Sequence, residues 1–328
     1  MKKKDFRIVF MGTPEFAVAS LEALVTQGYT IAGVVTAPDK PAGRGKKLQS
    51  SAVKLYAESK GLPILQPEKL KAESFIEALS ALKADLQVVV AFRMLPEIVW
   101  NMPSKGTINL HASLLPQYRG AAPINRAIMN GEKVTGLSTF FLTHEIDTGS
   151  IINRVELPIG DNETAGELHD RMMLAGADLL STTIEQIMTD NYTAISQENA
   201  PAGLQTLKPA PKIFKDDCII EWNNQGTSVF NQIRGLSPYP GAFTFIHSAQ
   251  TEPYQLKIFN SRFEPCTDPN STYEPGSVVI EERSKMKIAT TNGWIIPTEV
   301  QQSGRKRMSV ADYLRGLHDF KGLIARNQ

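Results

Sequence analysis

Three polar side chains of different chemistry could act together in this sequence. Asn109 and His111 are two residues apart at the end of an expected strand, so their side chains point to the same face. Polar groups at the carboxyl ends of strands in an open α/β sheet line the ligand crevice. An amide and an imidazole there can hold an oxyanion, and Asp147, 36 residues after His111, can take or relay a proton. The combination indicates transfer of an acyl or formyl group to an amine.

Each of these residues also has a purely structural interpretation. A lone histidine at a strand end is most often a satisfied core residue, Asn109 could cap a turn, and Asp147 could be a turn residue before Gly149. The conjunction of all three favours catalysis. No third residue lies at metal-ligand spacing from His111 and Asp147, so we expect no metal.

The composition is that of an ordinary soluble globular protein, with a length typical of about two domains. Of 328 residues, 42% are hydrophobic and 21% are charged, and the net charge is +1, which alone predicts no polyanionic partner. No apolar stretch approaches a membrane span, and the basic start does not resemble a secretion signal. We therefore expect a cytoplasmic protein that does not contact a membrane.

Short apolar runs alternate with helical patterns through the first half of the chain. This rhythm predicts a doubly wound, mostly parallel α/β sheet of Rossmann-like type. Thr13 is expected to cap the first helix, with Pro14 at its first position. Helices are expected around residues 75–82 and from about Thr164, and strands over 7–11, 30–36, 63–65, 86–91, 106–111, 137–142 and 151–157.

The pattern changes after residue 189. Ala, Pro and Gly are concentrated at residues 200–203, and Pro and Ala at 208–211, so we expect a linker over residues 190–208. The predicted domains are therefore a catalytic domain over 1–189 and a small β-barrel over 209–328, OB-like by analogy, with helices near Val229 and Val310. Its strands are expected over 244–247, 255–259, 277–280 and 293–297.

Several motifs resemble those of the folate-dependent formyltransferase family, and the resemblance covers nearly the whole chain. The segment 109–116 with Tyr118-Arg119-Gly120 resembles the family's formyl-folate signature, and Asp147-Thr148-Gly149 resembles its catalytic loop. The basic segment 38–48 and the C-terminal motifs 234–242 and 304–308 resemble the branch of the family that acts on charged initiator tRNA. The chain departs from the family at Phe92-Arg93, where a Tyr-Gly pair is common, and at Ser150, where an aspartate is usual.

The resemblance implies the substrates and the residues that meet them. The donor would be 10-formyltetrahydrofolate, and the acceptor would be the free α-amine of methionine on its initiator tRNA. Asn109 and His111 would stabilise the oxyanion, and Asp147 would assist proton transfer. Arg119 would either position a substrate or pair with a carboxylate. The expected folate contacts are Met94 and Leu95 together with the corner formed by Ser113, Leu114, Leu115 and Pro116.

Two basic clusters are candidate tRNA contacts. The loop 37–50 carries four basic residues against one acidic residue, Asp39. A charge run alone is usually a solvated surface, but the resemblance implies phosphate contacts here, which salt would weaken. The expected tRNA-binding residues are Lys40, Arg44, Lys46, Lys47, Arg305, Lys306 and Arg307. We expect the protein to be a monomer.

Three other functions compete with this interpretation. A formyltransferase for a sugar nucleotide or for glycinamide ribonucleotide would share Asn109, His111 and Asp147 but would not need the basic loop. A catalytically silent RNA-binding protein would not need the three residues intact. A dinucleotide-dependent dehydrogenase is disfavoured, because residues 12–16 lack the G-x-G-x-x-G spacing, and no G-x-x-x-x-G-K-[ST] motif for ATP is present.

Overall fold

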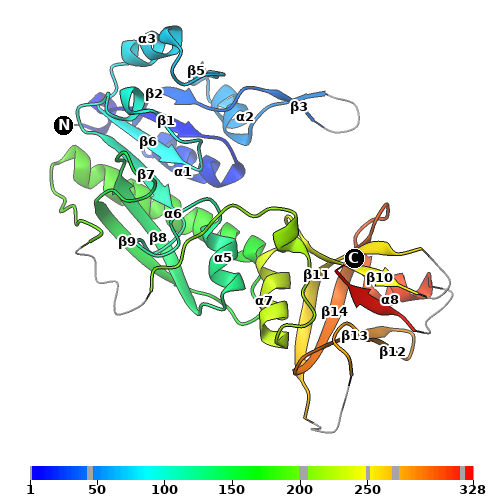
Figure 1. Cartoon of the computed structure of the whole chain (residues 1–328). Coiled ribbons are helices and arrows are strands. Elements are labelled where there is room, and N and C mark those ends of the chain that lie inside the picture. Colours follow the sequence, from blue (N-terminus) through cyan, green and yellow to red (C-terminus); the bar gives the residue numbers. More distant parts are fainter. Residues whose placement is uncertain are drawn as a thin grey trace. The chain divides into compact units, whose positions relative to one another are not determined.

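The computed structural model describes residues 2–42, 47–198, 206–248, 252–267, 273–317 and 322–327. The chain forms two compact units, each assembled from separate stretches of sequence (Figure 1). Unit 1 comprises Met1–Gly120, Thr135–Leu157 and His169–Pro209, and unit 2 comprises Ala121–Val134, Pro158–Leu168 and Ala210–Gln328.

A mostly parallel sheet forms the centre of unit 1, with strand order β5-β2-β1-β6-β7-β8-β9. Neighbouring strands run parallel from β5 to β7, whereas β8 runs antiparallel to β7. The predicted α/β sheet is therefore confirmed. The strands are β1 (Arg7–Gly12), β2 (Thr30–Val35), β5 (Ile64–Leu65), β6 (Leu86–Val90), β7 (Thr107–His111), β8 (Val134–Phe141) and β9 (Ile151–Pro158).

Helices cover both faces of this sheet, which is why β6 is buried along its whole length. On one face, α6 (Ala165–Met188) packs so closely that a Cβ on Gly176 would lie 2.9 Å from a methyl of Leu110 in β7. On the other face, Val9 and Met11 of β1 share a buried cluster with Phe75 and Leu79. The helices of unit 1 also include α1 (Glu15–Thr26), α2 (Ala52–Ser59), α3 (Glu73–Ala81) and α4 (Glu97–Trp100), and a 3-10 turn, η1 (Lys3–Asp5), precedes β1.

The starts of two helices test the capping predictions. The prediction for α1 is wrong: the helix begins at Glu15, and Pro14 occupies the cap position with an extended ψ of 175° and no side-chain cap. The extended ψ delays the first helical residue by one position. The predicted start of α6 is confirmed, because Thr164 and Glu167 form a reciprocal capping box. The Glu167 carboxylate accepts from the Thr164 backbone N–H at 2.8 Å, and the Thr164 hydroxyl accepts from the Glu167 N–H at 3.3 Å.

Unit 2 contains an antiparallel sheet with strand order β12-β13-β14-β11-β10-β16, and β15 pairs with β14. Ser277, just before β12, bridges Ile324 in β16, so the two ends of the sheet meet and nearly close a barrel. This confirms the predicted β-barrel. Its strands are β10 (Ala242–His247), β11 (Tyr254–Pro265), β12 (Val278–Glu281), β13 (Lys285–Thr290), β14 (Gly293–Gln302), β15 (Met308–Ser309) and β16 (Ile324–Arg326).

Helices at Val229 and Val310 were expected and are present as α7 (Gly226–Gly235) and α8 (Val310–Arg315). Both valines belong to the buried cluster that fills the barrel. Unit 2 also contains α5 (Pro123–Met129) and a 3-10 turn, η2 (Asp216–Cys218). Within the described ranges, no helix has the length and apolar character needed to cross a membrane.

Candidate active site

The structure brings His111 and Asp147 together. His111 is the last residue of β7, and Asp147 lies in the loop between β8 and β9. Nδ1 of His111 is 3.7 Å from Oδ2 of Asp147, and the two side chains are only 7% and 12% exposed. The β7–β8 pairing sets Ile108 opposite Phe141, so β8 ends beside the amino end of β7, and the loop that follows β8 brings Asp147 back to His111 at the carboxyl end.

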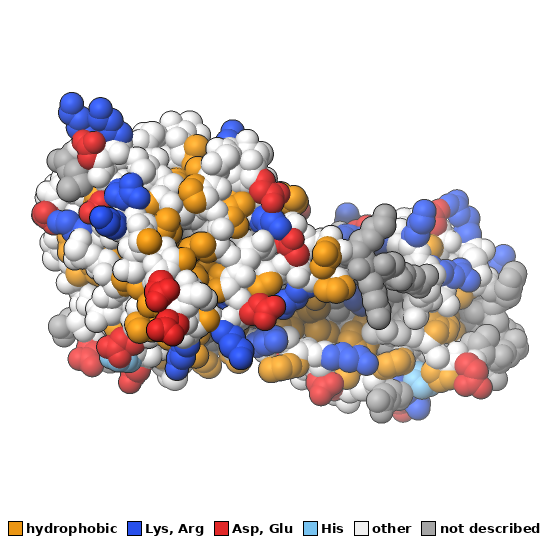
Figure 2. Space-filling view, turned by 90° about the horizontal axis from the view of Figure 1, so that it is seen from above, with side chains coloured by type: hydrophobic (Ala, Val, Ile, Leu, Met, Phe, Trp, Pro, Cys, Tyr) orange, Lys and Arg blue, Asp and Glu red, His pale blue; other side chains and the backbone are white. Residues whose placement is uncertain are grey.

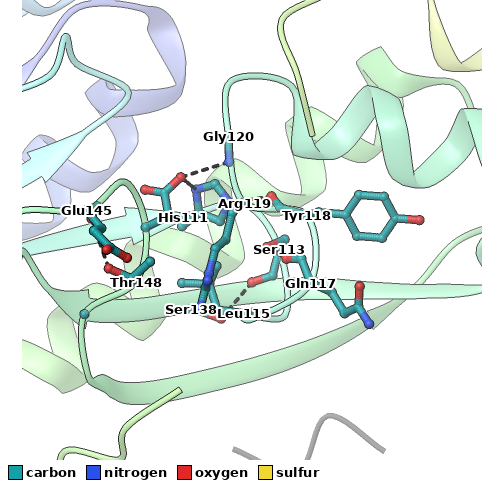
Figure 3. Close-up of polar contacts among 12 residues, drawn as sticks. His111, Ser113, Leu115, Gln117, Tyr118, Arg119, Gly120, Ser138, Glu145 and Thr148 are labelled. Carbon is teal, nitrogen blue, oxygen red and sulfur yellow. Dashed lines mark hydrogen bonds and ion pairs between the residues drawn. The ribbon is translucent and has the colours of Figure 1, made fainter. Parts of the chain in front are cut away.

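The turn that follows β7 contacts both side chains, and Figure 3 shows its residues Tyr118, Arg119 and Gly120 beside His111. Nε2 of His111 lies 2.9 Å from the carbonyl oxygen of Tyr118. A carbonyl only accepts, so Nε2 carries a proton and Nδ1 faces the carboxylate. The backbone N–H of Gly120 donates to Oδ2 of Asp147 at 3.0 Å. One turn therefore orients the imidazole and anchors the carboxylate.

The Asp147 loop has a constrained backbone. Asp147 has a φ of +55°, a left-handed conformation that is uncommon for a residue with a side chain. Two residues later, Gly149 is required by space, since a Cβ there would lie 1.6 Å from the carbonyl oxygen of Phe141. The conformation that presents Asp147 to His111 thus depends on the local packing of the loop.

Asn109 lies on the same strand face as His111, as its spacing predicts. Its side chain is half-buried, and no described residue makes a hydrogen bond with its amide. An amide in this position retains its two N–H groups for a bound molecule. The structure therefore places an available donor on the face of β7 that carries His111.

The corner from Ser113 to Pro116 is firmly held, and its Leu115–Pro116 peptide is cis. The buried hydroxyl of Ser138 donates to the Ser113 carbonyl at 2.7 Å and accepts from the Leu115 N–H at 3.0 Å. Arg154 in β9 donates to the Leu115 carbonyl at 3.1 Å. The backbone of this corner is therefore fixed close to the histidine. Leu114 is its one part-exposed side chain, whereas Ser113, Leu115 and Pro116 are buried.

The segment after β6 contains the departure at Arg93. The Arg93 guanidinium donates to the backbone carbonyls of Pro67 and Glu68, and it lies 5.5 Å from the centre of the Phe92 ring. The long side chain is therefore directed at the loop after β5. Met94 next to it is 73% exposed, whereas Leu95 is 8% exposed and packs in the core of unit 1.

Arg119 makes a contact that was not anticipated. Its Nε and Nη2 donate to Oε1 of Gln197 at 3.0 and 2.6 Å. The amide group of Gln197 in turn donates to the carbonyls of Asp147 and Gly149, both at 2.8 Å. Gln197 lies in the segment predicted to be a linker, and a glutamine in a stretch without helical or strand periodicity carries no local signal of such a contact.

The basic loop forms a hairpin of β3 (Lys40–Ala42) and β4 (Lys47–Gln49). At its base, Asp39 accepts from Nζ of Lys54 at 2.5 Å and from Nε2 of Gln66 at 2.9 Å. The hydrogen bond from Lys54 is the main reason that the pKa of Asp39 is lowered. Lys40 is exposed. Arg44, Lys46 and the side chain of Lys47 lie outside the described part of the chain.

The second basic cluster consists of Arg305, Lys306 and Arg307 in unit 2, and one of its three side chains is in an ion pair. Arg305 and Lys306 are exposed, but the Arg307 guanidinium pairs with Glu299 at 2.5 Å and lies 4.2 Å from the Phe259 ring centre. On the face drawn in Figure 2, Lys and Arg side chains and Asp and Glu side chains are both scattered among the described residues. The described residues contain no group of three or more potential metal ligands.

Fold and geometry first define a class: an α/β protein with a polar site at the carboxyl end of a central strand, followed by a small β-barrel. The chain belongs to the formyl transferase family. The model of the formyl transferase domain matches residues 6–184, and that of the formyl transferase C-terminal domain matches residues 212–318.

Relatives resemble the chain along nearly its whole length. A methionyl-tRNA formyltransferase from Parabacteroides distasonis is 52% identical over 317 residues, which cover 96% of this chain and 97% of that protein. A protein of the same name from Porphyromonas gingivalis is 48% identical over 316 residues, with the same coverage.

Solved structures share the fold at much lower identity. A sugar 3N-formyl transferase, WlaRD, has a TM-score of 0.62 and 19% identity, covering 92% of this chain and 99% of its own. HypX from Aquifex aeolicus has a TM-score of 0.62 and 16% identity, covering 94% of this chain and 46% of its own. Chains of different length and low sequence identity thus contain the same fold.

Proposed function

We propose that this protein transfers the formyl group of 10-formyltetrahydrofolate to the α-amine of methionine on initiator tRNA, producing formylmethionyl-tRNA for translation initiation. The observation that carries this proposal is identity of about half the residues, through both units, to proteins named methionyl-tRNA formyltransferase. A similarity confined to unit 1 would support formyl transfer but would leave the acceptor open.

Asn109 and His111 stabilise the oxyanion in this proposal. The neutral amine attacks the formyl carbon, and the carbonyl oxygen of the resulting tetrahedral intermediate becomes negative. The Asn109 amide donates to that oxygen. Nε2 of His111 already faces the Tyr118 carbonyl, so the second donor is the Nδ1–H of a doubly protonated imidazole. Oδ2 of Asp147 lies 3.7 Å from that Nδ1.

Asp147 assists the proton transfer. After attack, the amine nitrogen must lose a proton, and N10 of the folate must gain one before it leaves. A carboxylate can do both in turn, directly or through a water. The 3.7 Å separation of Nδ1 and Oδ2 supports this role, because it is longer than a hydrogen bond and leaves the two groups free to meet a substrate.

The corner Ser113, Leu114, Leu115 and Pro116 and the segment at Met94 and Leu95 are the proposed contacts with the folate. The support is positional: the corner follows β7 directly, and the hydrogen bonds to Ser138 and Arg154 fix its backbone. A fixed backbone binds a flat heterocycle without an ordering cost. Met94 offers an exposed apolar side chain, whereas the side chain of Leu95 is committed to the core.

The tRNA would be held by the basic hairpin and by the basic cluster of unit 2. Lys40 and Lys47 belong to the two strands of the hairpin, and Arg44 and Lys46 lie between these strands in the sequence. The ion pair of Asp39 with Lys54 anchors the base of the hairpin. Arg305 and Lys306 are exposed and can meet phosphates directly. Arg307 would have to share its guanidinium with Glu299.

We further propose that residues 1–189 are the catalytic domain, 190–208 the linker and 209–328 the tRNA-binding domain. We also propose that the protein is a monomer that acts in the cytoplasm, where charged initiator tRNA is consumed. Light scattering during gel filtration tests whether the protein is a monomer, and cell fractionation with an antibody tests whether it is cytoplasmic.

The deciding experiment follows labelled formyl from 10-formyltetrahydrofolate to methionyl initiator tRNA, with free methionine, an amino-sugar nucleotide and glycinamide ribonucleotide as parallel acceptors. Transfer to the charged tRNA alone supports the proposal. Transfer to a small amine would retain the formyl chemistry and reject the acceptor. No transfer to any acceptor would favour a binding protein on an enzyme fold.

A further inference from the structure

One buried glutamine outside the Asn109, His111 and Asp147 set has every polar position of its side chain in use. Gln197 is 5% exposed. Its two N–H groups reach the carbonyls of Asp147 and Gly149, both at 2.8 Å, and its oxygen accepts from Nε and Nη2 of Arg119 at 3.0 and 2.6 Å. A glutamine amide offers two donors and two acceptor positions, so none is left unpaired.

These contacts join the two segments that build the candidate site. Arg119 lies between Tyr118, whose carbonyl faces His111, and Gly120, whose N–H anchors the Asp147 carboxylate. On the other side, the Gln197 amide binds the carbonyls before and after Thr148. The glutamine therefore spans the turn after β7 and the loop after β8, and it contacts the backbone of Asp147 itself.

The Asp147 loop needs such a support. A residue with a side chain stays at a positive φ only where its surroundings enforce it, and Asp147 has a φ of +55°. Gln197 is itself held in place, because Ile195 and Ile151 exchange backbone hydrogen bonds of 2.8 Å at the start of β9. The support is thus anchored to the sheet.

We propose that Gln197 is a positioning residue of the transfer reaction: it fixes the Asp147 loop against the Arg119 turn so that the carboxylate faces His111. The proposal rests on the proposed function, in particular on the role of Asp147. It places a determinant of turnover inside residues 190–208, which the sequence alone predicts to be a linker.

The test is a double-mutant cycle in the full-length protein with Gln197→Ala and Asp147→Asn. Formyl transfer to methionyl-tRNA is measured in steady state, and in single turnover for the slow variants. If Gln197 acts through Asp147, Gln197→Ala lowers kcat by about 10- to 100-fold, as expected for a displaced catalytic group, while each KM changes by less than about twofold. In the Asp147→Asn background, the same change should cost less than about twofold.

Two further variants separate positioning from folding. Gln197→Glu keeps an oxygen for Arg119 but removes both donors to the loop, so it should lose turnover like Gln197→Ala. Its second carboxylate oxygen would face two buried carbonyls, so we expect a lower melting temperature, and circular dichroism at the assay temperature checks that the variant is folded. Glu198→Ala changes the exposed neighbour in the same segment and should leave both turnover and melting temperature unchanged.

The outcomes distinguish the positioning role of Gln197 from the catalytic role of Asp147 in the proposed function. An equal loss from Gln197→Ala in both backgrounds, or full turnover in Gln197→Glu, would overturn the positioning role and leave the proposed function intact. Full turnover in Asp147→Asn itself would overturn the role of Asp147 in the proposed function, and the positioning role with it.

Discussion

Oδ2 of Asp147 accepts a hydrogen bond from the Gly120 N–H at 3.0 Å and lies 3.7 Å from Nδ1 of His111. The carboxylate is therefore placed by the backbone of the turn after β7 and by the loop contacts of Gln197, with the histidine beyond hydrogen-bond distance. Because each partner has its own support, replacing one side chain should leave the other in position. This independence makes the single substitutions below informative about chemistry.

His111→Ala should abolish formyl transfer while the protein stays folded. The variant loses the proposed second oxyanion donor, and we expect kcat to fall by at least about 100- to 1,000-fold, the range for one lost donor. His169→Ala is the matched control, because that histidine is part-exposed and lies outside the site. Circular dichroism checks the fold, and unchanged turnover in His111→Ala would reject the mechanism.

Asn109→Ala should separate catalysis from stability. Among the described residues the Asn109 amide has no hydrogen-bond partner, so removing it should change the free energy of unfolding by less than about 0.5 kcal/mol. The loss of an oxyanion donor should lower kcat by about 100- to 1,000-fold with little change in either KM. Denaturant melts and steady-state kinetics test both parts. A large stability loss with normal kcat would assign Asn109 a structural task.

Ser138→Ala should weaken use of the formyl donor. The Ser138 hydroxyl satisfies the buried Ser113 carbonyl and Leu115 N–H, and its loss leaves both without their partner. We expect a cost of about 1–3 kcal/mol in unfolding free energy and a higher KM for the folate, because the corner loses its fixed backbone. Thr182→Ala removes an exposed hydroxyl from α6 and serves as the control. A KM change for the tRNA alone would contradict the assignment of the corner.

Arg44→Ala should impair use of the tRNA more than use of the folate. If Arg44 meets a phosphate, its removal raises the KM for methionyl-tRNA and lowers the salt dependence of tRNA binding by about one ion. Kinetics at several salt concentrations measure both effects, and Lys71→Ala, an exposed lysine outside the hairpin, is the control. Equal loss for both substrates would argue against the loop as a tRNA contact.

Much of the fold could be predicted because its signals are local. The apolar runs at 7–11 and 86–91 became β1 and β6, since strands buried on both faces require continuous apolar sequence, and the alternating segment 106–111 became β7. The barrel strands were partly found, but β13 was missed. The start of α1 was misplaced, because sequence alone does not fix the ψ of Pro14.

The candidate site also combines a feature that follows from local sequence with contacts between distant segments of the chain. The shared face of Asn109 and His111 follows from a spacing of two on a strand, and the sequence alone determined it. The approach of Asp147 depends on the loop after β8, which leaves the amino end of β7 and returns to His111 and Gly120, residues far from it in the chain. The contact of Gln197 with Arg119 spans 78 residues.

The sequence by itself therefore determined most of the elements, the α/β class and the shared strand face of Asn109 and His111, because periodicity and residue type are properties of short segments. Only the tertiary structure decided that the turn after β7 supports both His111 and Asp147, that Arg93 is directed at the loop after β5, and that the expected linker supplies Gln197. These relationships come from hydrogen bonds between distant backbone and side-chain groups, whose partners no local pattern specifies.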